Sequence, residues 1–196
     1  MGKVATGFST SLDGFIAGPN GDVGPLFDWY FAGDTEYTVP GGRFTLRVSR
    51  QSAELLRESY EGMGALVVGR RHFDHAHAWG GRHPMDVPVF VVTHSAPREW
   101  VYEGSPFTFV TDGLRSAVEQ AKRVAGSRDV GVGGADVAQQ CIRAGLVDEV
   151  GIDLVPVLLG EGIRFFDRLG ADKIELERTR VIEAPGVTHL RFRAMA

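Results

Sequence analysis

Cysteine is nearly absent from this sequence. Cys141 is the only one, so an internal disulfide framework and a cysteine-rich zinc site are both excluded. No apolar run reaches the ~18 residues that a membrane helix needs. Residues 1–15 lack the apolar core and the small-residue cleavage site of a signal peptide, and we expect a cytoplasmic protein. Basic residues are not in excess: 21 Lys and Arg stand against 25 Asp and Glu, which argues against nucleic acid as a partner.

What the sequence does contain is the composition of an ordinary globular domain. Hydrophobic residues make up 43% and charged residues 23% of the 196 residues, which suits one domain over residues 1–196. The 26 glycines fall mainly where a strand would meet a loop, and they form no repeat.

Short apolar segments alternate with helical patterns along the chain. Strands are predicted at 4–11, 65–68, 88–93, 107–110, 130–132 and 147–157, with a β-hairpin over 174–182 and 188–193. Helices are predicted at 50–62 with Ser49 as cap, at 114–125 with Asp112 as cap, and at 135–144. Short apolar strands between helices indicate a sheet buried on both faces. The expected class is therefore α/β, with a mainly parallel central sheet and an antiparallel C-terminal end.

Residues 22–49 fit neither pattern. They hold aromatic residues among glycines and prolines, without a clear period. A long irregular segment of this kind is often a functional loop. The alternative is a loop that its aromatic side chains pack against the domain.

Ligands of open α/β sheets bind beyond the carboxyl ends of the strands, so the residues that follow each strand are the candidate site. Gly133 and Gly134 stand between a strand and a helix, where a helix N-terminus favours phosphate. Asp136 takes the place of the third glycine of a dinucleotide fingerprint, and it can serve as an N-terminal helix charge. The pattern therefore predicts a phosphate-binding turn of another kind, or a tight turn without a ligand.

Three further junctions carry polar or glycine-rich residues. Arg70 and Arg71 follow the strand that ends at Gly69, and arginine forks onto phosphate oxygens; the alternative is a solvated helix start. Residues 93–95 could hold a ribose or a phosphate, or form a simple turn. The glycine-flanked segment 156–166 could close over a ligand or act as a structural crossover.

Acid–base candidates are few. Asp28 lies beside Trp29 among aromatic residues, where the pKa of a carboxyl group can rise until it donates a proton. Asp13 precedes Gly14 after the first strand. The alternatives are a solvent-facing loop acid for Asp28 and an Asp-Gly turn for Asp13.

Histidines concentrate between residues 72 and 83, but no acidic third ligand completes a metal signature. We predict no metal site there and expect these rings to lie at the surface or along a cofactor. Cys141 is expected to be a buried, inert thiol.

Five short motifs occur in order along nearly the whole chain: 11–17 (SLDGFIA), 68–73 (VGRRHF), 132–135 (VGGA), 145–149 (GLVDE) and 156–166 (PVLLGEGIRFF). Together they resemble the dihydrofolate reductase-like family. This family includes the C-terminal reductase domain of the bifunctional riboflavin-biosynthesis deaminase-reductase, a 5-amino-6-(5-phosphoribosylamino)uracil reductase. The resemblance implies a three-layer αβα fold and NADPH as hydride donor.

By motif position, the resemblance assigns cofactor contacts to four groups of residues. They are Ile16 and Ala17 beside the nicotinamide; Gly69, Arg70 and Arg71 at the pyrophosphate and 2′-phosphate; Thr93, His94 and Ser95 at the adenosine ribose; and Val132, Gly133, Gly134, Ala135, Asp136 and Val137 around the pyrophosphate.

The sequence thus predicts an NADPH-dependent reductase acting on a small aromatic or heterocyclic substrate, with Asp28, Asp13 or a water as proton donor. The alternatives are a non-catalytic NADP(H)-binding or sensing module, or a flavin or deazaflavin binder on the same fold. A homodimer is expected through the C-terminal part of the sheet, unless the candidate residues Phe165, Phe166, Leu176 and Phe192 belong to the core of one chain.

Overall fold

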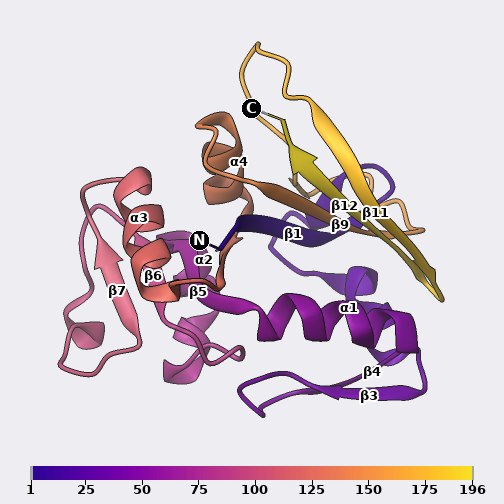
Figure 1. Cartoon of the computed structure of the whole chain (residues 1–196), viewed down its shortest axis with the longest axis horizontal. Coiled ribbons are helices and arrows are strands. Elements are labelled where there is room, and N and C mark those ends of the chain that lie inside the picture. Colours follow the sequence, from indigo (N-terminus) through magenta and orange to yellow (C-terminus); the bar gives the residue numbers. More distant parts are fainter. Residues whose placement is uncertain (1, 196) are drawn as a thin grey trace.

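An eight-stranded sheet with helices on both faces forms the body of the protein (Figure 1). The computed structural model describes residues 2–195. The strands of this sheet are β1 (Val4–Ser11), β5 (Met63–Gly69), β6 (Val89–Val92), β7 (Phe107–Val110), β8 (Asp129–Gly133), β9 (Glu149–Val155), β11 (Leu176–Ala184) and β12 (Val187–Ala194). Two small sheets join β2 (Phe15–Ala17) to β10 (Ile163–Arg164) and β3 (Thr35–Thr38) to β4 (Thr45–Val48).

The helices are α1 (Arg50–Glu61), α2 (Arg70–His75), α3 (Leu114–Ala125) and α4 (Ala135–Arg143), with 3-10 segments η1 (Gly24–Phe31), η2 (His77–Gly81) and η3 (Arg98–Trp100). None of the helices in this described range is long and apolar enough to cross a membrane.

The strand order is β11-β12-β9-β1-β8-β5-β6-β7. From β9 to β7 all neighbours pair in parallel, whereas β12 pairs antiparallel with both β9 and β11. The predicted α/β class, with its mainly parallel sheet and antiparallel hairpin, is confirmed. The predicted strands are present, with ends shifted by one or two residues in most cases.

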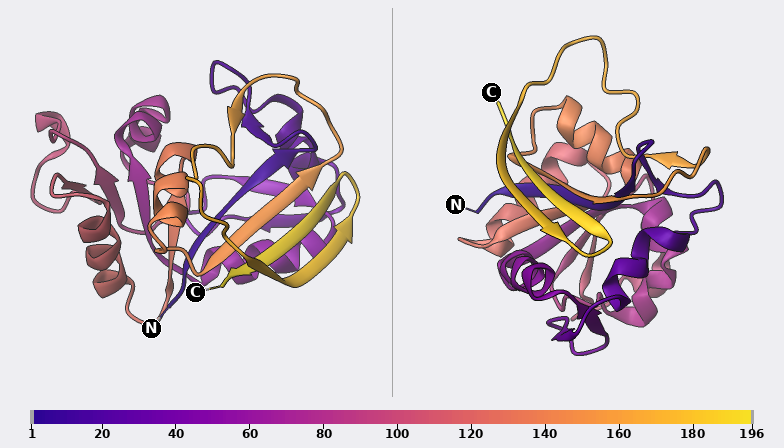
Figure 2. Two further views of the ribbon diagram at one scale, coloured as in Figure 1. Left: turned by 90° about the horizontal axis from the view of Figure 1, so that it is seen from above. Right: turned by 90° about the vertical axis from the view of Figure 1, so that its right-hand side faces the viewer.

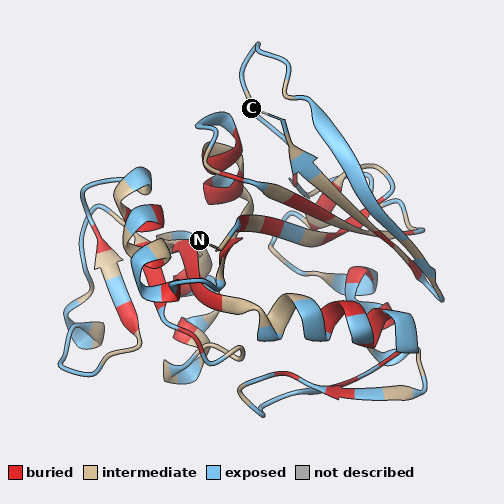
Figure 3. Cartoon of the chain, in the orientation of Figure 1, coloured by how far each residue is buried: buried red, intermediate tan, exposed pale blue. Residues whose placement is uncertain are grey.

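Helices cover both faces of the sheet, as the two rotated views show (Figure 2). On one face, α3 and α4 pack their small side chains, including Ala117 and Ala138, against alternate valines of β5 and β8. On the other face, α1, η1 and the β3–β4 hairpin form a second cluster, and Phe73 of α2 joins a third. Buried residues accordingly follow the strands and the inner helix faces (Figure 3).

The helix caps differ from one another. Ser49 caps α1 as predicted, because its hydroxyl accepts a hydrogen bond from the amide of Ser52 at 3.1 Å. Asp112 was expected to cap α3, and this prediction is wrong. Gly113 occupies the cap position at φ 108°, and the carboxylate of Asp112 accepts a hydrogen bond from the hydroxyl of Ser116 at 2.8 Å instead.

Residues 22–49 are not an irregular loop. They form η1 and the β3–β4 hairpin, in which Leu26, Trp29 and Tyr37 are buried. The aromatic side chains therefore pack much of this segment into the domain, which was one of the two interpretations. Short 3-10 turns have no apolar period of 3.6 residues, which explains why the pattern was not recognised.

The C-terminal hairpin places β11 at one edge of the sheet, where it is exposed along most of its length (Figure 3). Of the four candidate interface residues, Phe165 is fully buried in the core and Phe192 packs against the same cluster. Phe166 and Leu176 are partly exposed. Pairing of two chains stays a prediction.

Candidate functional site

The ladder between β1 and β8 is short, and this opens the sheet. β1 pairs with β8 only from Val4 to Thr6, whereas it pairs with β9 from Ala5 to Ser11. At the end of the short ladder the hydroxyl of Thr6 donates a hydrogen bond to the carbonyl oxygen of Val132 at 2.9 Å. Beyond this point β1 continues while β8 turns into α4. A crevice at such a point is where open α/β sheets bind their ligands.

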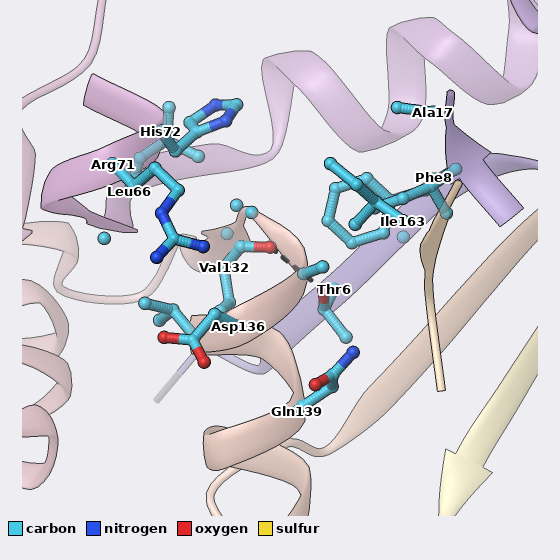
Figure 4. Close-up of a pocket in the computed structure, with 18 of the residues that line it drawn as sticks. Thr6, Phe8, Ala17, Leu66, Arg71, His72, Val132, Asp136, Gln139 and Ile163 are labelled. Carbon is cyan, nitrogen blue, oxygen red and sulfur yellow. Dashed lines mark hydrogen bonds between the residues drawn. The ribbon is translucent and has the colours of Figure 1, made fainter. Parts of the chain in front are cut away.

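A cavity of about 1750 Å³ occupies the crevice and extends along the sheet (Figure 4). Sites for one small ligand typically measure about 300–1,000 Å³, so this cavity has room for more than one small ligand. The structure brings together every residue that the family resemblance assigns to a cofactor. The cavity lining includes Ile16, Ala17, Gly69, Arg70, Arg71, Thr93, His94, Ser95, Val132, Gly133, Gly134, Ala135, Asp136 and Val137.

The glycine pair leaves the turn at the start of α4 without side chains, so its backbone is uncovered. Gly134 is the N-cap residue at φ 86°, and a Cβ atom there would lie 3.2 Å from Cβ of His72. A Cβ atom on Gly133 would lie 3.2 Å from a methyl group of Val68. The first amides of a helix have no intrahelical acceptor and carry the positive end of the helix dipole. The turn can therefore receive a phosphate group through its backbone.

The two neighbouring arginines differ in their contacts. Nε of Arg70 donates to both carboxylate oxygens of Asp74, at 2.7 and 2.9 Å, and Nη1 donates to the carbonyl oxygen of Ser95 at 3.1 Å. Arg70 thus fastens α2 to the turn over residues 93–95. Arg71 is exposed, lines the cavity, and makes no hydrogen bond or ion pair with another residue in the range 2–195. Its guanidinium group is the one available to an anion, and it lies near the side chain of Asp136 in the close-up (Figure 4).

The segment after β9 closes one end of the cavity. β10 pairs with β2, with Ile163 opposite Ala17. A Cβ atom on Gly162 would lie 2.1 Å from the carbonyl oxygen of Ala17, so only glycine permits this close approach. Ile163 and Ala17 both line the cavity, and the close-up shows them beside Phe8 (Figure 4).

The two predicted acids lie elsewhere. Asp28 is exposed on η1 and does not line the cavity. The carboxylate of Asp13 accepts hydrogen bonds from the Ser11 hydroxyl at 2.6 Å and from the amides of Leu159 and Gly160 at 3.1 and 2.7 Å. The Ser11 hydroxyl, together with these amides, lowers the pKa of Asp13 to about 2. Asp13 therefore joins the loop after β1 to the loop after β9, and the structure places neither carboxylate in the cavity.

Other polar groups, which the sequence did not single out, line the cavity on the α1 side. They are Tyr30 of η1, Tyr60 of α1, Asp153 of β9 and Arg191 of β12. The two tyrosine oxygens are 3.4 Å apart, and burial raises the pKa of both hydroxyls, so both stay protonated. For Asp153 and Arg191 the sequence signal was a polar residue at every second position of two apolar strands.

Asp153 is at the centre of this polar group. Its Oδ1 atom lies 2.7 Å from Nδ1 of His189 and accepts a hydrogen bond from Nη1 of Arg191 at 2.9 Å. Burial alone would raise the pKa of Asp153, but the hydrogen bond to His189 and the charge of Arg191 hold that pKa below its ordinary value. Asp153 is therefore an ionised acceptor at neutral pH.

Three of the clustered histidines, His72, His75 and His83, line the cavity, and two of them are neutral rings. Burial lowers the pKa of His72, and it lowers that of His83 to about 4. Both rings pack against Trp79, with centroid distances of 5.6 and 4.6 Å.

Comparison with known proteins identifies the family and the fold. The family model described as "RibD C-terminal domain" matches residues 3–190. The uncharacterized protein YwjB of Bacillus subtilis (strain 168) is 26% identical over 180 residues, which cover 91% of each chain. The crystal structure of a putative riboflavin biosynthesis protein from Shewanella sp. PV-4 superposes with a TM-score of 0.72 at 22% identity and covers 99% of both chains.

The chain also matches part of a larger protein. The diaminohydroxyphosphoribosylaminopyrimidine deaminase/5-amino-6-(5-phosphoribosylamino)uracil reductase of Thermotoga maritima superposes with a TM-score of 0.60 at 17% identity. The match covers 99% of this chain and 57% of that one. The fold is the dihydrofolate reductase-like fold expected from the motifs, and the chain belongs to the RibD C-terminal domain family.

Proposed function

We propose that the protein is an NADPH-dependent reductase that transfers a hydride to a small aromatic or heterocyclic substrate. Membership of the RibD C-terminal domain family supports reductase chemistry of the riboflavin-pathway type. The observation that carries the proposal is the crevice between β1 and α4. It connects a glycine-lined helix N-terminus to a pocket with polar and aromatic walls, and thus offers a cofactor site and a substrate site in one cavity.

The residues present fit NADPH. Gly133 and Gly134 have no side chains to cover the turn, where a Cβ atom would crowd Val68 or His72, and the start of α4 offers free amides to the pyrophosphate. Arg71 is the cation available to the 2′-phosphate, while Arg70 holds the turn over residues 93–95 against which the ribose would rest. Ile16 and Ala17 would form the wall beside the nicotinamide.

When bound, NADPH supplies the hydride. The protein positions the two reactants relative to each other. Tyr30 and Tyr60 form a wall against which a planar substrate can pack. Because neither Asp13 nor Asp28 lines the cavity, we propose water as the source of the proton that completes the reduction.

Thermal unfolding with added NADPH or NADH tests the cofactor half of the proposal. A ligand that binds only the folded state raises the melting temperature by mass action. We expect a clear rise with NADPH and a small one with NADH at the same concentration. No rise with either nucleotide would refute the proposal.

Loss of NADPH absorbance tests the catalytic half. The substrates to offer are the deaminated aminouracil ribotide that the Thermotoga relative's name indicates, dihydrofolate, and a panel of small quinones and nitroaromatic compounds. Turnover with one of them is expected. Tight NADPH binding without turnover of any of them would identify a binding or sensing module instead.

A further inference from the structure

On the face of the sheet that lies under α1, the cavity is lined by glycines. Three glycines on neighbouring strands, Gly7, Gly131 and Gly151, line the cavity there. The guanidinium group of Arg191 lies directly on Gly151, because a Cβ atom on that glycine would lie 3.2 Å from Cζ of Arg191. Glycine on β9 therefore allows an arginine of β12 to lie flat along the sheet and reach Asp153.

The hydrogen bond between Asp153 and Arg191 uses only part of the hydrogen-bonding capacity of the two side chains. Oδ1 of Asp153 meets both His189 and Arg191, whereas Oδ2 makes no hydrogen bond with residues in the described range. Nη1 of Arg191 donates to Asp153 and to the carbonyl oxygen of Leu190, each at 2.9 Å, whereas Nε and Nη2 make no hydrogen bond within that same range. The two side chains are only 13% and 14% exposed, and both line the cavity. A carboxylate that can accept a further hydrogen bond and a guanidinium group that can donate one thus lie side by side in a largely buried part of the cavity.

His189 holds Asp153 in this position. The ring is 1% exposed, with Nε2 2.8 Å from the Ser52 hydroxyl and its plane edge-on to Trp29 at 5.1 Å. An ionised carboxylate only accepts hydrogen bonds, so Nδ1 carries the proton that Asp153 accepts. In the neutral ring, Nε2 then accepts from Ser52, which in turn accepts from Ser49, the cap of α1.

Ser52, His189 and Asp153 are connected in the order found in serine hydrolases. The Ser52 side chain is buried behind the histidine, however, and it does not line the cavity. Its hydroxyl is not presented to a substrate, so the chain of hydrogen bonds serves to orient Asp153.

We propose that Asp153 and Arg191 form a specificity site, which binds the edge of a ring or chain carrying an N–H donor beside a carbonyl oxygen, and that His189 is its positioning residue. The N–H would donate to Oδ2 of Asp153, and the carbonyl would accept from Nε or Nη2 of Arg191. The proposal rests on the proposed function only in taking this cavity to hold a substrate. The chemical class is a lactam, imide or amide.

A pair of small probes tests the site on the unaltered protein. 2-Pyridone presents an N–H beside a carbonyl, and N-methyl-2-pyridone is the same ring without the donor. Ligand-observed NMR titration is expected to show that 2-pyridone binds at least about tenfold more tightly than N-methyl-2-pyridone. This is the usual contribution of a hydrogen bond to a charged group. Equal affinities, or no binding of either probe, would overturn the proposal.

Variants then locate the site. Asp153→Asn is expected to reduce the preference for 2-pyridone at least several-fold, while Glu183→Gln, on the exposed strand β11, leaves it unchanged. An unchanged preference in Asp153→Asn would overturn the assignment. His189→Asn places an amide N–H near the position of Nδ1 and should keep the preference, whereas His189→Phe should lose it. This preference is a ratio of two affinities, so a purely structural role of His189 would not change it in folded protein.

The outcomes separate the two proposals. Discrimination between the pyridones without any effect of NADPH on the melting temperature would leave the specificity site standing and remove the reductase function. A clear rise of the melting temperature with NADPH, without discrimination between the pyridones, would support the reductase function and remove the specificity site.

Discussion

The hydroxyl of Thr6 bridges β1 and β8 by donating to the carbonyl oxygen of Val132, at the point where the two strands separate. The bridge closes the sheet on one side of this point and leaves it open on the other. Everything that we assign to ligand binding lies along the open side, from the glycine turn of α4 to the polar group around Asp153.

Replacing Arg71 with glutamine should remove the preference for NADPH over NADH. The side chain is the unpaired cation of the phosphate end, and a hydrogen bond to a charged group is worth about 1.5–3 kcal/mol, so NADPH affinity should fall about tenfold or more while NADH affinity changes little. Titration of the variant with both nucleotides measures this. Arg123→Gln, at the exposed end of α3, is the matched control. A variant that keeps its preference would show that another group reads the 2′-phosphate.

Gly134→Ala should lose NADPH binding and about 1–2 kcal/mol of stability. The positive φ of Gly134 is unfavourable for alanine, and the new methyl group would press on His72. Gly145, at the other end of α4, also has a positive φ but has nothing within 4 Å of its Cβ position. Gly145→Ala should therefore cost less stability than Gly134→Ala and bind NADPH normally. Equal NADPH binding by the two variants would argue against a phosphate at the glycine turn.

Asp13→Asn should destabilise the protein at neutral pH and much less at pH 2. The folded-state pKa of Asp13 is about 2, below the ordinary value of 3.8, so its ionised form contributes stability above pH 3.8. That contribution is lost as the pH falls from 3.8 through 2. Thermal unfolding of wild type and variant across this range measures the difference. Asp28→Asn, which removes an exposed carboxylate, should leave stability and turnover unchanged.

Tyr37→Phe should stabilise the protein by about 1 kcal/mol. The Tyr37 hydroxyl is buried and has no hydrogen-bond partner among residues 2–195, so its removal relieves an uncompensated desolvation. Urea unfolding gives the free energy directly. Tyr102→Phe, at an exposed position, should change it by much less. A clear loss of stability in Tyr37→Phe would indicate a partner that the isolated chain does not provide.

The sheet could be predicted from the sequence because its strands are short apolar runs that end in glycine or in turn residues, as in residues 65–69 and 129–134. The residues that we propose for the phosphate end of the site lie at those same junctions. The polar group under α1 could not be predicted, because it depends on the register that places His189 opposite Asp153. Asp13 was misleading because an aspartate that accepts amides from a distant loop looks, in sequence, like one that faces a substrate.

The exposed strand β11 bears on how the protein behaves at high concentration. An edge strand with unpaired amides and carbonyls is a template on which another chain can add a strand. Here Glu177, Arg178, Arg180 and Glu183 place charge along that edge, and the pairing register shifts between Arg178 and Arg180. Both features discourage edge-to-edge polymerisation, so we expect the charges of this strand to keep the protein in solution at high concentration.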